Sequence, residues 1–134
     1  MRTNRTTLLS VVVTVLVVVT VLVAVSHAAL SLEDDKRELD RLVDQVTKTK
    51  SIGIFSKLAL KGDAEKLWRD LGKFHKGVDG VKISELDERY NLIVHKLELS
   101  IRKRDTVLAQ AIADFREPLW QRLKNPDSFA TLMS

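Results

Sequence analysis

Near the start of the chain, apolar residues run almost without interruption from Leu8 to Val25. Between Arg5 and Glu33 lie 27 residues without a formal charge, and the stretch from Leu8 to Val25 is almost purely aliphatic. At about 1.5 Å per residue, a helix of 18 residues spans roughly 27 Å, close to the hydrocarbon thickness of a bilayer. In lipid every backbone polar group must bond within its own segment, so this stretch is predicted to be a membrane helix.

The flanks of the apolar segment indicate its orientation but leave its processing open. Arg2 and Arg5 precede it and acidic residues come after it, so the short tail is predicted to stay inside and the rest to be exported. Small residues at Ser26 and Ala28 would also suit cleavage of a signal peptide near Ala28. An apolar core of 18 residues exceeds the roughly 7 to 15 of a signal peptide, which favours an uncleaved anchor over residues 8–30.

Beyond this segment the apolar residues recur at intervals of three and four, the period of an amphipathic helix. Ser31 is predicted to cap the first of these helices. A shorter helix follows over residues 51–61, Gly62 breaks it, and Asp63 caps a third helix that stops at Gly77. The apolar stripe of the first helix consists of Leu39, Leu42, Val43 and Val46, and that of the third helix of Ala64, Leu67, Leu71 and Phe74.

The second half of the domain continues in the same way, with one apolar stripe on Leu86, Tyr90, Ile93, Leu97 and Ile101 and another on Leu108, Ala111, Ile112, Phe115 and Leu119. A turn over residues 77–80 precedes a long helix capped by Ser84, and Asp105 caps the next helix. Pro118 lies within the last apolar stripe. Because proline lacks an N–H and clashes with the preceding turn, this helix is predicted to kink or restart near Glu117.

These patterns predict an all-α protein with two parts. Residues 1–30 form an N-terminal transmembrane (or signal) helix, and residues 31–134 form a small bundle of four or five helices. Residues 125–127 end the last long helix and leave a tail that either docks or stays loose. The apolar arc of the 51–61 helix is predicted to pack in the core. Because lysines flank this arc, the alternative is that the helix lies on a membrane surface. That arc contains Ile54, Phe55, Leu58 and Ala59.

Three stretches of the exported domain carry a resemblance to known sequences. They read SIGIFSKLALKGDAEKLWRDL, ELDERYNLIVHKLELS and REPLWQRLKNPDSFA, and together they cover most of the domain. They resemble a family of small bacterial proteins with an N-terminal membrane segment and a helical domain. The resemblance implies a bacterial origin and no activity.

The charge balance argues against a nucleic-acid ligand. The net charge is +4, but Arg2 and Arg5 precede the apolar segment, so the remainder carries 20 basic and 18 acidic residues. Both signs are interspersed, whereas binding to phosphates needs cations gathered on one face. The chain has no cysteine, which excludes disulfides, thiolate nucleophiles and cysteine-ligated metals.

Residues that could support catalysis or metal binding do not form a recognisable motif. His75 and His95 lie on different predicted helices, and neither belongs to a paired-histidine or Glu-x-x-His motif. His95 is predicted to face solvent, opposite the core stripe. Acid pairs such as Glu85 with Glu88 are typical of solvated helix faces unless a cleft separates their pKa values. We therefore predict no catalytic residue, no metal site and no cofactor.

Aromatic and basic side chains are the candidates for partner contacts. Tryptophan is enriched at binding hot spots, although large rings in a small helical domain also fill cores. Three cations closing a helix would suit anionic lipid headgroups or an acidic partner, although the helix dipole alone explains them. The candidate partner-binding residues are Trp68, Tyr90, Trp120, Arg102, Lys103 and Arg104.

The function that these features predict is binding rather than catalysis. We expect a membrane-anchored helical domain that acts by protein–protein interaction, as an adaptor, assembly or regulatory factor. Its partner is an unidentified protein, and its location is the periplasmic face of a bacterial inner membrane. The alternative is a periplasmic or secreted binding protein, of the inhibitor or immunity type, released by cleavage near Ala28.

Overall fold

The computed structural model describes residues 32–134. The chain divides into two compact units, residues 1–34 and residues 35–134. The predicted membrane segment over residues 8–30 and the possible cut near Ala28 lie outside the described residues. Among the residues described, no helix is both long enough and apolar enough to cross a bilayer.

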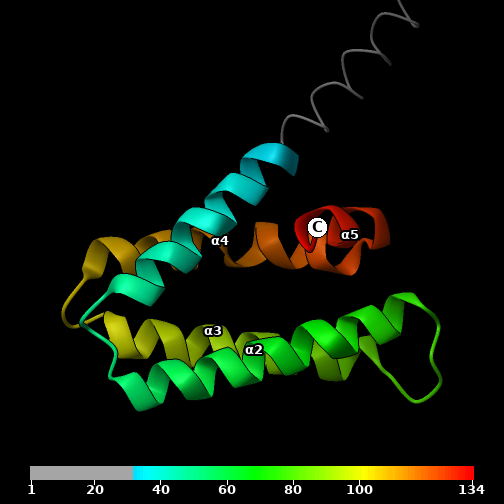
Figure 1. Cartoon of the computed structure of the whole chain (residues 1–134), viewed down its shortest axis with the longest axis horizontal. Coiled ribbons are helices and arrows are strands. Elements are labelled where there is room, and N and C mark those ends of the chain that lie inside the picture. Colours follow the sequence, from blue (N-terminus) through cyan, green and yellow to red (C-terminus); the bar gives the residue numbers. More distant parts are fainter. Residues whose placement is uncertain (1–31) are drawn as a thin grey trace, which may run out of the picture. The chain divides into compact units, whose positions relative to one another are not determined.

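Five helices make up the described residues, without a strand among them, which confirms the predicted all-α class. The first covers residues 32–48. It is followed by α2 (Ile54–His75), α3 (Ile83–Ile101), α4 (Thr106–Lys124) and α5 (Pro126–Leu132), as shown in Figure 1. The connections are short, so helices that follow one another along the chain also pack together.

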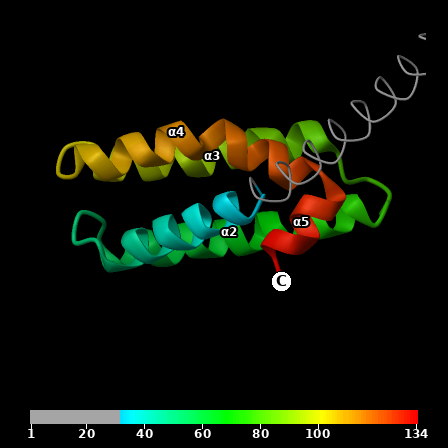
Figure 2. The ribbon, with the colours of Figure 1, turned by 90° about the horizontal axis from the view of Figure 1, so that it is seen from above.

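The core lies where α3 packs against both α2 and α4, and α5 packs on α4. Figures 1 and 2 show the three long helices running alongside one another. Most of the deeply buried side chains occupy the predicted apolar stripes, so periodicity placed the core correctly. The largest fully buried side chains are Leu67, Leu71, Leu86, Ile101 and Leu123.

The 32–48 helix makes polar contacts with other helices near its two ends. At one end Arg122 in α4 donates a hydrogen bond to Asp35 over 2.8 Å. At the other, the Lys57 ammonium donates to the backbone carbonyl of Thr47 over 2.8 Å. Between them Leu42 is buried, whereas Val43 is 56% exposed. The middle of this helix therefore spans a region that its apolar stripe fills only in part.

Two predicted boundaries in the first half of the domain are wrong. Gly62 does not break a helix and Asp63 does not cap one, because α2 runs through both. A glycine inside a helix costs only about 1 kcal/mol relative to alanine, which the burial of Leu67 and Leu71 outweighs. Nor does Ser84 cap α3, because the N-cap of that helix is Lys82.

The C-terminal part also departs from the predicted boundaries. The expected restart near Glu117 is wrong, because α4 continues through Pro118. Proline removes a single N–H from the helix, and the buried residues on its far side, including Leu123, hold the remaining turns in place. Of the two possibilities for the tail, docking is correct. Residues 126–132 form α5, capped by the Asn125 side chain, and Leu132 is buried.

Two predicted turns and caps are confirmed. The α2–α3 connection turns at Gly77 and Gly80, whose φ angles of 74° and 84° lie in the left-handed region that favours glycine. The N–H of Val78 bonds to the carbonyl of Lys73, which closes the end of α2 beside Gly77. The Asp105 carboxylate accepts a hydrogen bond from the N–H of Leu108 over 3.0 Å and caps α4 as predicted.

The apolar arc at the start of α2 is not in the core, so the packing predicted for it is wrong. Ile54 is 75% exposed, Phe55 is 88% exposed and Leu58 is 61% exposed. Periodicity identifies the apolar face of a helix, but whether another element covers that face depends on the tertiary arrangement. These residues occupy the first turns of α2 and leave an apolar surface there.

Candidate binding cleft

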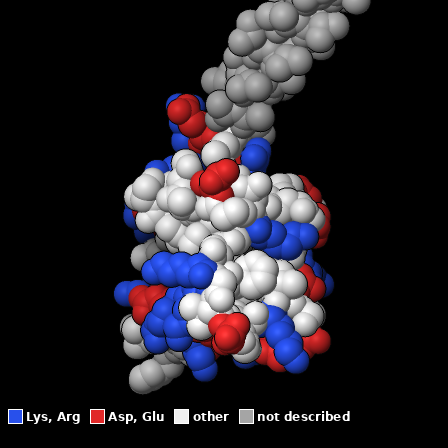
Figure 3. All heavy atoms as spheres, turned by 90° about the vertical axis from the view of Figure 1, so that its right-hand side faces the viewer, with Lys and Arg blue, Asp and Glu red and all other residues white. Residues whose placement is uncertain are grey.

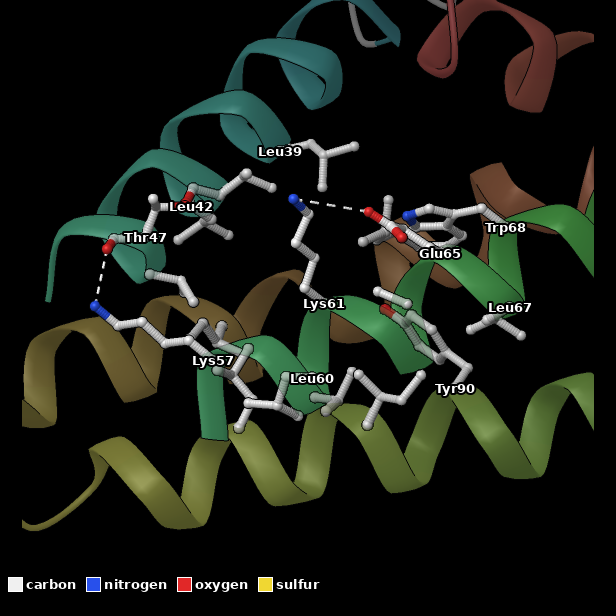
Figure 4. Close-up of a pocket in the computed structure, with 18 of the residues that line it drawn as sticks. Leu39, Leu42, Thr47, Lys57, Leu60, Lys61, Glu65, Leu67, Trp68 and Tyr90 are labelled. Carbon is white, nitrogen blue, oxygen red and sulfur yellow. Dashed lines mark hydrogen bonds and ion pairs between the residues drawn. The ribbon is translucent and has the colours of Figure 1, made fainter. Parts of the chain in front are cut away.

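An apolar cleft with a volume of about 490 Å³ opens between the 32–48 helix and the three long helices. Figure 4 shows Leu39 and Leu42 facing it from the first helix, and Leu60 and Trp68 from α2. From α3 and α4 the lining includes Tyr90, Ile93, Val94, Leu97, Ile112, Phe115 and Leu119. Side chains from four helices therefore converge on one space that they do not fill.

The size of the cleft is difficult to reconcile with ordinary core packing. Protein interiors contain few voids larger than a water molecule. A sealed, dry void of 490 Å³ would cost on the order of 10 kcal/mol, as much as the roughly 5–15 kcal/mol that stabilises a whole domain. The exposed Val43 and Leu58 at its edge show that the cleft is open to the surface. An open apolar cleft of this volume has the dimensions of a ligand site, roughly 300–1,000 Å³.

The wall formed by α3 and α4 is held by polar bonds as well as by packing. The Tyr90 hydroxyl donates to the carbonyl of Arg116 over 2.7 Å. The Arg116 guanidinium donates to the side-chain oxygen of Asn91 over 3.0 and 2.6 Å. Burial raises the pKa of the Tyr90 phenol well above its ordinary value, so this hydroxyl stays protonated and acts as a donor. These bonds give the wall a fixed geometry.

The rim of the cleft along α2 carries two ammonium groups and one carboxylate. Lys57 uses one of its three N–H donors on the Thr47 carbonyl and keeps two for other acceptors. Lys61 lies 3.9 Å from the Glu65 carboxylate, and both side chains are largely exposed. An exposed pair at that distance contributes little stability. The rim therefore has a net positive charge on side chains that can turn toward a ligand (Figure 4).

The structure distributes the predicted partner-binding residues over three environments. Trp68 and Tyr90 line the cleft. Trp120 is buried in the core, where its indole stacks on the Tyr90 ring. The basic cluster lies in the connection between α3 and α4 and is exposed, with Arg102 also bonded to Glu98 over 3.3 Å. None of its three residues lines the cleft: Arg102, Lys103 and Arg104.

The two described histidines lie in different environments. The His75 ring lies against Phe74 and Phe129, and its Nε2 is 2.7 Å from the carbonyl of Leu123. His95 is exposed, as predicted. Within residues 32–134 no group of His, Asp or Glu side chains is arranged to hold a metal ion. Figure 3 shows basic and acidic side chains interspersed over the visible face of the described residues.

Comparison with known proteins adds no identity to this geometry. No protein-family model matches the chain, and searches of curated proteins and of solved structures find no match. The resemblance to a family of small bacterial proteins therefore stays a prediction.

Several cleft residues were predicted from the sequence only as core residues. Leu39, Val46 and Leu97 belong to regular apolar stripes, and nothing in their spacing separates a filled core from an open one. The sequence does contain one relevant signal. Apolar residues at the start of α2 alternate with Lys57 and Lys61, the pattern of a surface that meets both an apolar and a charged group.

Proposed function

We propose that this chain is a non-enzymatic binding protein whose working site is the apolar cleft of its helical domain. The domain is displayed on the extracytoplasmic face of a bacterial inner membrane by an anchor over residues 8–30. The ligand contributes an apolar portion that occupies the space between the 32–48 helix and the long helices. The chain holds this ligand and carries out no chemistry on it.

The unfilled cleft is the observation that supports this proposal. Its lining is almost entirely carbon, and its few polar groups stand at the edge, which is the usual composition of a site that binds by burial. Covering an apolar surface contributes about 25 cal/mol for each Å² removed from water, so an occupant would stabilise the complex without a catalytic group. The 32–48 helix, which is bonded to α4 through Asp35 and to α2 through Thr47, is the wall that would adjust to that occupant.

The anchor and the compartment are supported by the sequence. The 18 residues from Leu8 to Val25 are almost all aliphatic and suit a bilayer, and the charge bias predicts export of the helical domain. The alternative is cleavage near Ala28 and release into the periplasm or the medium. Mass spectrometry of the mature N-terminus, together with the cell fraction in which it occurs, distinguishes the two. Uncut chain in the soluble cytosolic fraction would contradict both.

Protein–protein interaction is the second candidate, and one observation favours it. Ile54, Phe55 and Leu58 expose a contiguous apolar surface at the start of α2, beside the cleft. Apolar patches that are larger than single scattered residues often mark protein contacts. An adaptor or assembly factor would use this surface for its partner. Site-specific photo-cross-linking from position 55 in intact membranes tests this second function. The control is the same cross-linker at Val107, an exposed apolar position of α4.

The cleft itself is tested by photolabelling the full-length chain in phospholipid nanodiscs. The probe is a neutral long-chain alcohol with a diazirine in its chain, and mass spectrometry locates the adducts. We expect adducts on the cleft residues of the 32–48 helix and α3. Ala64→Phe, which places a ring in the cleft, should reduce them about tenfold, as expected for a blocked site. Ala113→Phe makes the same change on an exposed position of α4 and should leave them unchanged.

A second substitution protects this experiment against misfolding. Leu97→Trp fills the cleft from α3, and circular dichroism checks the helix content of each variant. If both filled variants are folded and still labelled like the parent chain, the cleft is not the binding site. Adducts spread evenly over the exposed apolar residues would lead to the same conclusion.

A further inference from the structure

We propose that the ligand of the cleft is a single-chain amphiphile with an anionic head. Its acyl chain lies among the aliphatic side chains, and its head lies at Lys57 and Lys61. This inference rests on the proposed function and adds to it the chemical class of the ligand. It uses the shape of the cleft, the charge of its rim and the position of the cleft in the chain.

The shape of the cleft suits one extended chain. The residues of α2 that line it run from Lys57 to Trp68, about 16 Å along the helix axis at 1.5 Å per residue. Figure 4 shows Lys57 toward one end of this row, with Trp68 and Tyr90 toward the other. A volume of about 490 Å³ is in the lower half of the range of ligand pockets, too small for a lipid with two chains. The aliphatic lining offers contact without directional bonds, as an unbranched chain requires.

The charge of the rim determines the sign of the head. Two ammonium groups and one carboxylate stand along α2, and the Arg116 guanidinium of α4, which is bonded to Asn91, also lines the cleft. Both ammonium groups can take a further acceptor at little cost. The Lys61–Glu65 pair, 3.9 Å long and exposed, loses little when Lys61 turns to a ligand. A carboxylate or phosphate would form charge-assisted hydrogen bonds with both lysines. A cationic head would have only the Glu65 carboxylate to bind.

The position of the cleft in the chain identifies the membrane as the source of such a ligand. Leu39, its first lining residue, comes nine residues after the proposed anchor ends at residue 30. Residues 32–39 of this stretch belong to the 32–48 helix, where each residue advances about 1.5 Å, so the stretch reaches on the order of 15 Å, less than the thickness of one bilayer core. The cleft therefore stays close to a bilayer that contains acyl chains. Free fatty acids and lysophospholipids both present one chain with one anionic head.

The test compares charged and neutral probes on the full-length chain in nanodiscs. A diazirine fatty acid, a diazirine lysophosphatidylglycerol and the diazirine fatty alcohol of equal chain length are applied separately. We expect an anionic probe to label the cleft about three- to fivefold more than the alcohol, as expected for exposed charge pairs. Lys57→Gln with Lys61→Gln should remove that preference, whereas Lys66→Gln, exposed elsewhere on α2, should keep it. Glu65→Gln should increase it. The anionic probe that labels the cleft more strongly shows whether the ligand is a free fatty acid or a lysophospholipid.

The outcomes separate this inference from the proposed function. Equal labelling by the alcohol and both anionic probes would overturn the anionic head and leave the apolar site standing. A preference that survives the double lysine substitution would overturn the role of the rim. Labelling that falls as more copies are placed in each nanodisc would show that a second copy occupies the cleft, which also overturns the inference. No labelling of the cleft by any probe would refute the proposed function itself.

Discussion

The ring of Tyr90 in α3 stacks on the indole of Trp120 in α4, with centroids 4.9 Å apart and an angle of 20° between the planes. The Tyr90 hydroxyl also bonds to the carbonyl of Arg116, one turn before Trp120. The same side chain lines the cleft, so the stack joins the core to the proposed site. Two aromatic rings in contact with a directional bond beside them fix α3 and α4 relative to each other.

Replacing Tyr90 by Phe should destabilise the domain by about 1 kcal/mol, the net contribution of one hydrogen bond. The phenyl ring can keep the stack on Trp120, so the helix packing should remain. Urea unfolding of the full-length chain in nanodiscs, followed by tryptophan fluorescence, measures the change. Val107→Ala, at an exposed position of α4, is the control. A Tyr90→Phe variant as stable as the parent chain would mean that the bond to Arg116 contributes nothing.

The attachment of the 32–48 helix gives a second prediction. Asp35→Asn weakens the bond from Arg122 by removing the carboxylate charge, so the first helix should open more often. A loss of about 1 kcal/mol raises amide exchange about fivefold wherever exchange follows local opening. Hydrogen exchange with mass spectrometry should show the increase in residues 35–46 and not in α3.

Asp44→Asn is the matched control, because it removes an exposed ion pair within the same helix. Its contribution to stability should be small. If both variants exchange alike, or if α3 and α4 open together with the first helix, the 32–48 helix is not an independently attached wall. The cleft would then have no adjustable side.

The sequence predicted the helical class and most of the core because both depend on local spacing. The stripes through Leu71, Leu86 and Ile101 are buried as expected. Boundaries were less predictable, because they depend on tertiary packing. One glycine at position 62 costs about 1 kcal/mol, and the contacts that overcome this cost come from other helices. The same applies to Pro118, which α4 accommodates.

The cleft could not be predicted from local spacing. The stripe of the 32–48 helix looks like any core stripe, yet Val43 is exposed and Leu42 is buried. The position of this helix also depends on its contact with α4 between Asp35 and Arg122, which are 87 residues apart in the chain. Long-range polar contacts of this kind leave no periodic signal. Of the predicted contact residues, Trp68 and Tyr90 do line the cleft.

The Asp70–Arg89 ion pair predicts a pH dependence of stability. The hydrogen bond from Arg89, over 2.7 Å between α2 and α3, holds the pKa of the Asp70 carboxyl below its ordinary value. Because the pKa of Asp70 is lower in the folded chain than in the unfolded chain, the ion pair stabilises the fold fully at pH values above the unfolded pKa. That stability is lost as the pH falls through the folded value. Asp70→Asn should therefore lose less than about 1 kcal/mol at neutral pH, since the pair is partly exposed.

Below the folded pKa of Asp70 the parent chain and the Asn variant should be equally stable, because the parent carboxyl is then protonated. Unfolding free energies at pH 7 and near pH 2, at constant ionic strength, measure the difference. Asp63→Asn, at an exposed position of the same helix, should show no such convergence. A difference for Asp70→Asn that is constant with pH would indicate a packing effect rather than an ionic one.

Two glycines of the described chain should respond in opposite directions to alanine. Gly62 lies inside α2 and a Cβ there would meet nothing within 4 Å, so Gly62→Ala should stabilise the domain by about 0.5–1 kcal/mol. Gly77 also has open space, but its φ of +74° strains any other residue, so Gly77→Ala should destabilise by about 1 kcal/mol. Urea unfolding measures the change in stability of both variants.

Because Gly62 follows Lys61 directly, a stiffer α2 in the Gly62→Ala variant should also slow labelling of the cleft without changing the preference for an anionic probe. Destabilisation by Gly62→Ala would mean that α2 does not run unbroken through this position.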